Sequence, residues 1–288
     1  MKKYNIAGIK LGFDFQYSEY FENNIEQYQI DYDEPVDYEI SVKTYKHLDI
    51  PDDTPVLTYK NRFIYDFGDS EALVVLDDKG LVKQYIEYTK DHKRIDIFMT
   101  KHQKHTLAEM EYVLSGLLFL EIALKEHKLP FHASAIKHKN QAVLFSAPSG
   151  GGKSTHAHYW QMMLDDITYI NDDKPLIHKV DNQFIVSGTP WSGKDTINTN
   201  DSVPLKAIVF IEKSDTNTIK KLSVKEALHY ILRNSLRPRQ KALVHNAMDL
   251  LNDITKNIPL YLLKAKNDAS SVTCVYKKLF QEGANHEN

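Results

Sequence analysis

The chain has 288 residues, 42% hydrophobic and 26% charged, which is ordinary for a globular protein of one large or two modest domains. Its formal net charge of −3 offers no electrostatic basis for a nucleic-acid partner. A single cysteine, Cys274, excludes an internal disulfide, and no stretch reaches the roughly 18 apolar residues of a membrane span, so we expect a cytoplasmic protein without a membrane partner.

Residues 1–100 alternate short apolar runs with turn residues, a pattern that is typical of antiparallel strands. Gly68 and Asp69, for example, separate two such runs, and Asn61 separates two others. The pattern predicts a β-rich N-terminal domain, residues 1–104, that recognises a substrate, mediates homo-oligomerisation or shields the second domain. We expect strands at residues 4–13, 38–45, 56–60, 62–67, 71–77, 81–89 and 94–100, and a short helix within residues 15–29.

A long helix over residues 106–128 should open the second domain, residues 105–288. It begins with Thr106 and Glu109 in the arrangement of a capping box, and its apolar residues keep helical spacing, which predicts core packing. Residues 131–138 follow as a strand with His132 near its start. By position alone, a single strand histidine is more often a packed core residue than a catalyst.

A glycine-rich loop follows residues 142–145, an apolar run with the composition of a buried strand. It matches the P-loop pattern G-x-x-x-x-G-K-[ST], except that Ala147 stands at the first glycine position. Glycines let backbone N–H groups surround a polyphosphate, while the Lys153 ammonium and the Ser154 hydroxyl suit phosphates and Mg²⁺. A flexible linker is the other interpretation. The residues expected to bind the nucleotide are Ser149, Gly150, Gly151, Gly152, Lys153, Ser154 and Thr155.

Two adjacent carboxylates, Asp172 and Asp173, end a strand predicted at residues 167–170. One short helix and this strand separate them from Lys153, so they should lie beside the glycine-rich loop. One aspartate could ligate Mg²⁺ together with Ser154, and the other could accept the proton of an attacking hydroxyl; the sequence leaves open which does which. A surface turn is the alternative interpretation of the same residues.

The rest of the second domain mixes strands and helices. Residues 188–194 form a loop whose Trp191 either walls a ligand site or anchors the loop in the core. A cationic stretch at residues 233–241 includes Arg237 and Arg239, which could stabilise charge on a transferred phosphoryl group or belong to a solvated link between helices. We expect strands at residues 175–180, 183–187, 206–212, 218–222 and 260–263, and helices at residues 156–164, 223–236, 242–256 and 268–281.

Three motifs, in this order, make residues 105–288 similar to HPr kinase/phosphorylase and its relatives, which share a fold with ATP-dependent phosphoenolpyruvate carboxykinase. They are residues 131–136 with His132, the glycine-rich loop, and the aspartate pair. The resemblance implies ATP and Mg²⁺ as cofactors and catalytic roles for Lys153, Asp172 and Asp173. It also implies an Asp–His pair, in which His132 orients or tunes an aspartate near the phosphates.

The segment after the aspartate pair departs from the HPr kinases proper. Residues 187–193 read Ser-Gly-Thr-Pro-Trp-Ser-Gly, and no acid follows until Asp195, whereas those kinases carry a glutamate-containing signature. The segment is similar to one in a branch of HPr-kinase-related proteins, many of them encoded with peptide-modification pathways. The departure argues against HPr itself as the substrate and against the reverse phosphorylase reaction.

Together these features predict an α+β/α/β protein, with a β-rich N-terminal domain before a phosphoenolpyruvate carboxykinase-like P-loop kinase domain. The predicted function is ATP-dependent transfer of the γ-phosphate to a hydroxyl, most simply a Ser or Thr of a peptide or protein, with an aspartate base and Mg²⁺. A small-molecule hydroxyl kinase of the same fold and a non-catalytic ATP-binding regulator are the alternatives. No G-x-G-x-x-G pattern is present, so a dehydrogenase is not expected.

Overall fold

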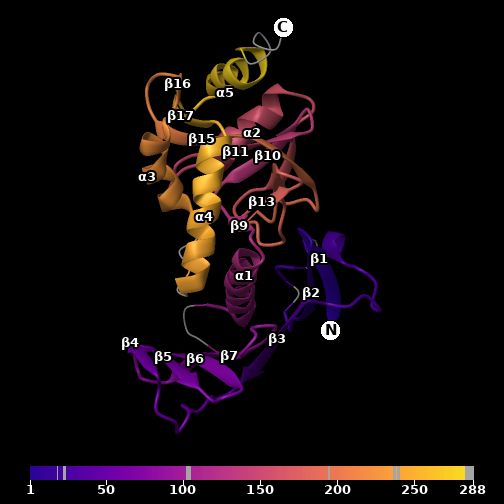
Figure 1. The fold of residues 1–288 in the computed structure, drawn as a ribbon, viewed down its shortest axis with the longest axis vertical. Coiled ribbons are helices and arrows are strands. Elements are labelled where there is room, and N and C mark those ends of the chain that lie inside the picture. Colours follow the sequence, from indigo (N-terminus) through magenta and orange to yellow (C-terminus); the bar gives the residue numbers. More distant parts are fainter. Residues whose placement is uncertain are drawn as a thin grey trace. The chain divides into compact units, whose positions relative to one another are not determined.

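The computed structural model describes residues 1–17, 19–21, 24–101, 105–193, 195–235, 238 and 241–282. By its internal contacts the chain divides into two compact units, Met1–Phe119 and Leu120–Asn288, and each contains both sheet and helix, so the protein is α+β (Figure 1). The division falls inside helix α1 (Leu107–Lys125), whereas the sequence pattern places a domain boundary before that helix. No helix among the described residues is long and apolar enough to cross a membrane.

The first unit is built on one sheet with the strand order β1-β2-β3-β8-β7-β6-β5-β4. Strands β4 to β8 form the predicted meander of antiparallel hairpins, but β3 lies parallel to both β2 and β8, which joins chain segments far apart in sequence. The strands are β1 (Lys2–Ile6), β2 (Ile9–Asp14), β3 (Tyr38–Tyr45), β4 (Leu57–Tyr59), β5 (Arg62–Asp66), β6 (Ser70–Leu76), β7 (Val82–Thr89) and β8 (Arg94–Thr100).

The single strand predicted over residues 4–13 is wrong, because the chain reverses at Ala7 and Gly8. Both residues have positive φ, 53° and 86°, the backbone of a tight hairpin turn, so β1 and β2 pair with each other. The short helix predicted within residues 15–29 is a 3-10 turn, η1 (Glu26–Tyr28), in the part of that segment that the structure describes.

Helix α1 begins as predicted. The Glu109 N–H donates to the Thr106 hydroxyl at 3.1 Å, and the Thr106 N–H donates to the Glu109 carboxylate at 3.0 Å, which confirms the capping box. One turn further on, the fully buried Glu111 carboxylate accepts the backbone N–H groups of Gln16 and Tyr17, at 2.6 and 2.9 Å. The first turns of α1 are therefore tied to the segment that follows β2.

The second unit is built on a mixed sheet in the order β12-β10-β11-β15-β14-β13-β9, with β17 added beside β15 and β16 beside β17. Strands β11, β15 and β17 run parallel, and β10 and β12 are antiparallel additions next to β11. The strands are β9 (Leu129–Pro130), β10 (Ser134–His138), β11 (Gln141–Ser146), β12 (Thr168–Asn171), β13 (Leu176–Val180), β14 (Gln183–Ser187), β15 (Ser202–Lys213), β16 (Thr218–Lys221) and β17 (Leu260–Ala265).

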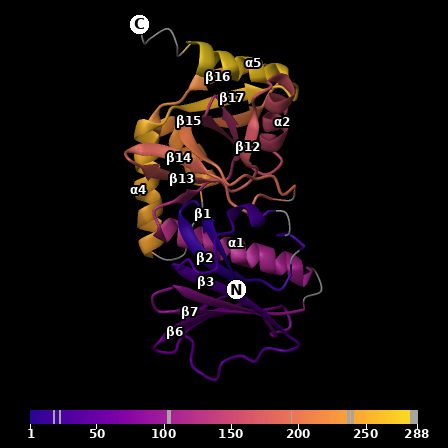
Figure 2. The ribbon, with the colours of Figure 1, turned by 90° about the vertical axis from the view of Figure 1, so that its right-hand side faces the viewer.

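Helices cover both faces of this sheet. They are α2 (Lys153–Met163), α3 (Val224–Asn234), α4 (Lys241–Asn257) and α5 (Ser270–Tyr276), which continues into η2 (Lys277–Gln281). Helices α2 and α5 contact each other on one face (Figure 2), where Trp160 and Val275 are buried, while α3 and α4 cover the other face with Ile231 and Ile254.

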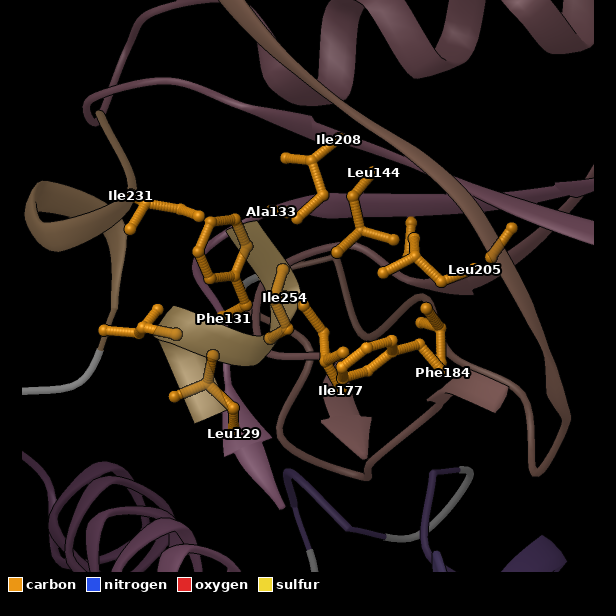
Figure 3. Packing of buried hydrophobic residues seen from close by; sticks show 14 of the residues in the cluster. Leu129, Phe131, Ala133, Leu144, Ile177, Phe184, Leu205, Ile208, Ile231 and Ile254 are labelled. Carbon is orange, nitrogen blue, oxygen red and sulfur yellow. The ribbon is translucent and has the colours of Figure 1, made fainter. Parts of the chain in front are cut away.

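Strand β11 shows why this sheet needs helices on both sides. Its residues alternate between two hydrophobic clusters, Leu144 joining Ile231 and Ile254 in one, and Phe145 joining Trp160 in the other. A strand buried on both faces reads as a continuous apolar run, as residues 142–145 do. Figure 3 shows the first cluster, in which Leu144 and its neighbours pack against Phe131. The rigid strand ends just before the glycine-rich loop.

Candidate functional site

The loop between β11 and α2 has a backbone that requires its glycines. Gly150 and Gly152 have φ of 73° and 97°, and Gly152 is the N-cap residue of α2. A Cβ on Gly151 would lie 2.6 Å from the Ala147 Cβ and 2.8 Å from the Pro148 carbonyl oxygen. Ala147 itself does not have positive φ, so a side chain is tolerated where the P-loop pattern has its first glycine.

The start of α2 offers what a phosphate group needs. Nothing lies within 4 Å of the Cβ positions built on Gly150 and Gly152, so the backbone is open on that side. The unpaired N–H groups and the positive dipole end of a helix N-terminus attract anions. Lys153, the first residue of α2, is only 8% exposed; burial lowers its pKa, although the Asp173 and Asp172 carboxylates oppose the shift.

Asp172 lies just beyond the end of β12 and is 8% exposed. Its Oδ1 accepts the Ser134 hydroxyl at 2.5 Å, and the Ser154 side chain lies near the same carboxylate. Burial raises the pKa of Asp172, and the two serine side chains and the Lys153 charge oppose the shift. The structure therefore brings Asp172 together with Lys153 and Ser154, residues from the other end of the same βα unit.

Asp173 has different partners. Its Oδ1 lies 3.3 Å from the His132 Nε2, and its Oδ2 accepts the Lys174 ammonium at 2.8 Å. Burial by itself raises the pKa of Asp173, but the His132 hydrogen bond and the Lys174 charge outweigh it and lower the pKa to about 2. The Asp173 side chain is 31% exposed, so this carboxylate, unlike Asp172, remains accessible.

His132 does not lie in a strand, so the strand predicted over residues 131–138 is partly wrong. Residues 131–133 connect β9 to β10 without strand geometry, and their backbone groups form hydrogen bonds with other parts of the unit. The His132 N–H donates to the Asn234 carbonyl at 2.8 Å, and the Ser146 hydroxyl donates to the His132 carbonyl at 2.8 Å. These bonds fix the backbone of His132 between the end of β11 and the end of α3.

Asn171 is a site residue that sequence reasoning missed. It is fully buried, and its Oδ1 accepts the backbone N–H groups of Asp173 and Lys174 at 2.8 and 2.6 Å. Its Nδ2 donates to the Thr189 carbonyl at 2.8 Å. An Asn followed by residues that favour turns is a signal for such an Asx turn, and it could have been read from the sequence. The turn does not lie at the surface, because Asn171 and Asp172 are buried, so the alternative of a surface turn is wrong.

The loop after β14 packs beside Asp173 and Lys174. The Thr189 hydroxyl donates to the Lys174 carbonyl at 3.1 Å, and a Cβ on Gly193 would lie 3.3 Å from the Asp173 Cβ. Trp191 is only 4% exposed, which fits the anchoring interpretation of this residue. Of the residues in the cationic stretch, Arg237 and Arg239 lie outside the described residues.

Cavities adjoin residues of the site that surround the aspartates. One of about 380 Å³ adjoins the start of α2 and is lined by Gly151, Gly152, Thr155, His156, Tyr159, Ile211, Lys213, Ser214, Asp215, Ala265, Lys266 and Asn267. Another of about 250 Å³ adjoins His132 and is lined by Leu120, Pro130, His132, Lys174, Arg233, Asn234 and Ser235. Both belong to the second unit.

The donor set fits the cofactors that the sequence pattern implies. The open backbone at Gly150 and Gly152 and the buried Lys153 suit a polyphosphate. Ser154 and Asp172 present hard oxygen ligands to one spot, and Mg²⁺ in nucleotide sites is typically held by one or two carboxylates plus phosphate oxygens and water. Among the described residues, no group of three His, Cys, Asp or Glu side chains could hold a metal without such added ligands.

A comparison with known protein families covers the end of the first unit and most of the second. The family model described as "SynChlorMet cassette protein ScmC" matches residues 95–270, more than half of the 288 residues. The chain belongs to the ScmC family. The match covers the glycine-rich loop, both aspartates and the end of α3, and therefore includes the site described above.

A solved structure similar to the chain is the HPr(Ser) kinase/phosphatase from Coxiella burnetii. The two are 14% identical, the alignment covers 54% of this chain and 98% of that protein, and the TM-score is 0.34. A likeness of this size does not bear on function. No curated protein matches the chain.

Proposed function

We propose that the second unit is an ATP-dependent phosphotransferase that phosphorylates a hydroxyl group, most simply a Ser or Thr of a peptide or protein. The observation that carries the proposal is the convergence of Lys153, Asp172 and Asp173 beside the open start of α2. An ammonium and two carboxylates with different partners supply the groups that phosphoryl transfer requires of a protein. A small-molecule hydroxyl would be served by the same groups.

The nucleotide would occupy the cavity of about 380 Å³ beside the glycine-rich loop. Its phosphates would lie on the backbone of Gly150, Gly151 and Gly152 and against the Lys153 ammonium. The rest of the nucleotide would contact Tyr159 and the ends of β15 and β17. ATP supplies the phosphoryl group that passes to the hydroxyl oxygen as ADP leaves, and Mg²⁺ neutralises the phosphate charge.

The two aspartates divide the work in this proposal. Asp172 and Ser154 would hold Mg²⁺, because their side chains lie near each other beside Lys153 and their oxygens are hard ligands. Asp173 would accept the proton of the attacking hydroxyl, because it is the more exposed of the pair and adjoins the second cavity through His132 and Lys174. The low pKa keeps Asp173 ionised at neutral pH, so the carboxylate is available to accept the proton.

The experiment is incubation of the full chain with γ-labelled ATP, Mg²⁺ and candidate acceptors, with phosphate transfer read by mass spectrometry. The family's description as a cassette protein makes peptides and proteins encoded in the same cassette the first candidates. We expect one phosphate on a Ser or Thr, lost in Lys153→Ala and in Asp173→Asn. Asp165→Asn, an exposed aspartate after α2, is the matched control and should transfer normally.

Normal transfer by Asp173→Asn and Asp172→Asn would refute the assigned roles. Tight ATP binding without transfer to any acceptor and without hydrolysis would instead support the alternative of a non-catalytic ATP-binding regulator.

A further inference from the structure

The cavity of about 250 Å³ beside His132 carries a positive charge that the proposed chemistry does not use. Among its described lining residues, Lys174 and Arg233 are cations and none is a carboxylate. Lys174 already forms an ion pair with Asp173. The Arg233 side chain is exposed and has no hydrogen bond or ion pair with any other residue that the structure describes.

Arg233 is held at a fixed place relative to Asp173. It lies in the last turn of α3, next to Asn234, whose carbonyl accepts the His132 N–H at 2.8 Å. The imidazole of the same His132 contacts the Asp173 carboxylate. The Arg233 guanidinium therefore lines the cavity, and the proposed proton acceptor contacts two other lining residues, His132 and Lys174.

The size and charge of the cavity restrict what it can bind. Pockets for drug-sized ligands measure roughly 300–1,000 Å³, so about 250 Å³ suits one or two side chains rather than a larger ligand. A guanidinium fork with no partner is suited to a carboxylate, which it can bind through two parallel hydrogen bonds. A hydroxyl beside Asp173 and a carboxylate beside Arg233 would then belong to one acceptor.

We propose that this cavity selects acceptors with a carboxylate next to the reacting hydroxyl, and that Arg233 determines this specificity. The source of the carboxylate is taken to be an acidic residue beside the Ser or Thr of a peptide. The inference rests on the proposed function, since it names the substrate class of the same site.

The test uses the full chain with three peptides that differ in the residue beside one Ser, which is Glu, Gln or Lys. Two small probes, 3-hydroxypropanoate and its uncharged counterpart 1,3-propanediol, form a second arm. Transfer kinetics are measured with ATP and Mg²⁺. Binding is measured separately by calorimetry, with Mg²⁺ and a non-hydrolysable ATP analogue, so that it does not depend on turnover.

We expect the Glu peptide to bind about tenfold more tightly than the Gln peptide, with a correspondingly lower KM and similar kcat. Arg233→Gln should abolish the preference, and Arg233→Glu should shift it to the Lys peptide. Lys225→Gln, which removes a cation from the first turn of the same helix, is the control and should keep the preference. If 3-hydroxypropanoate is preferred over 1,3-propanediol while the peptides bind equally, the cavity still binds a carboxylate. The carboxylate would then belong to a small hydroxy acid rather than to a peptide.

Equal binding of all three peptides and of both small probes would overturn the inference. So would an equal loss of kcat with every acceptor in Arg233→Gln, because that would assign the guanidinium to the transferred phosphoryl group. Transfer without any charge preference refutes this inference alone. An Arg233-dependent preference in binding, without transfer to any acceptor, refutes the kinase proposal and leaves the carboxylate site intact.

Discussion

The His132 Nε2 lies 3.3 Å from the Asp173 Oδ1, while the backbone N–H and carbonyl of the same histidine are bonded to Asn234 and Ser146. The imidazole of His132 thus contacts the Asp173 carboxylate, while the main chain of His132 holds the residue in position. Because these contacts use different atoms, the contribution of the imidazole can be removed without releasing the backbone.

Replacing His132 by alanine should raise the pKa of Asp173 from about 2 toward that of an ordinary aspartate. We expect kcat to fall about 10- to 100-fold, because the carboxylate is no longer held in place and misplacement of a catalytic group by about 1 Å can cost about 100-fold. The acidic limb of the pH–rate profile should move to higher pH, because the carboxylate is protonated more readily. His132→Gln, which keeps a donor, should recover part of the rate; an unchanged pH profile in His132→Ala would contradict the pairing.

Gly151→Ala should distort the glycine-rich loop. The added Cβ would lie 2.6 Å from the Ala147 Cβ and 2.8 Å from a backbone oxygen of Pro148, too close for either to remain in place. We expect a stability loss of about 1–3 kcal/mol, measured by urea unfolding, and at least a tenfold loss of affinity for a fluorescent ATP analogue. The double variant Ala147→Gly/Gly151→Ala removes one of the two clashes and should recover part of both losses. Wild-type behaviour of Gly151→Ala would contradict the loop geometry.

Ser134→Ala should weaken Mg²⁺ binding through Asp172. The serine donates the 2.5 Å hydrogen bond to Oδ1, so its loss leaves a buried carboxylate with one donor fewer and a higher pKa. Residues behind a metal ligand typically contribute 10- to 100-fold to metal affinity, and we expect about a tenfold loss in a Mg²⁺ titration of nucleotide binding. Ser115→Ala, another fully buried serine that donates to a backbone carbonyl, is the control. An unchanged Mg²⁺ titration would separate Ser134 from the metal site.

Glu111 should make the stability of the first unit depend on pH. Burial raises its pKa from 4.5 to about 7, although the N–H groups of Gln16 and Tyr17 oppose the shift. Because the folded-state pKa lies above the unfolded value, the contribution of this group is fully present below pH 4.5 and is lost as pH rises through about 7. The loss should be about 3 kcal/mol, since one pKa unit corresponds to about 1.4 kcal/mol.

Amide hydrogen exchange in α1 at pH 5 and pH 8 measures this effect. The exchange free energies should fall with pH in the wild type and change little in Glu111→Gln. Both tryptophans, Trp160 and Trp191, belong to the second unit, so their fluorescence in urea reports separately on that unit and should not follow the Glu111 variant. Identical pH dependence of exchange in the two proteins would refute the assignment.

Sequence patterns predicted the features that depend on neighbours in the chain. The capping box at Thr106, the hairpin of β13 and β14, and the buried strand β11 all have the expected residues and bounds within one or two positions. Each is decided by side chains two to four positions apart, whose hydrogen bonds or periodicity are readable in a line of letters. The hairpin of β1 and β2 was missed because Ala7 is not an expected residue at positive φ.

The partners of the two aspartates were only partly readable. Ser134 lies two residues after His132, a spacing that would have placed the two on one face of an extended segment and marked Ser134 as a candidate. Arg233 gave no such signal, because α3 reaches His132 through a single backbone hydrogen bond between residues that are far apart in the chain.

By itself, the sequence determined the glycine-rich loop, the caps and the pair Asp172 and Asp173, because local sterics and hydrogen bonding specify these features. The tertiary structure alone decided the strand order, the separation of Asp172 toward Ser154 and Asp173 toward His132, and the place of Arg233. Long-range pairing of β10, β11 and β12 and the packing of α3 bring these groups together, and such contacts depend on which buried surfaces meet rather than on any local pattern.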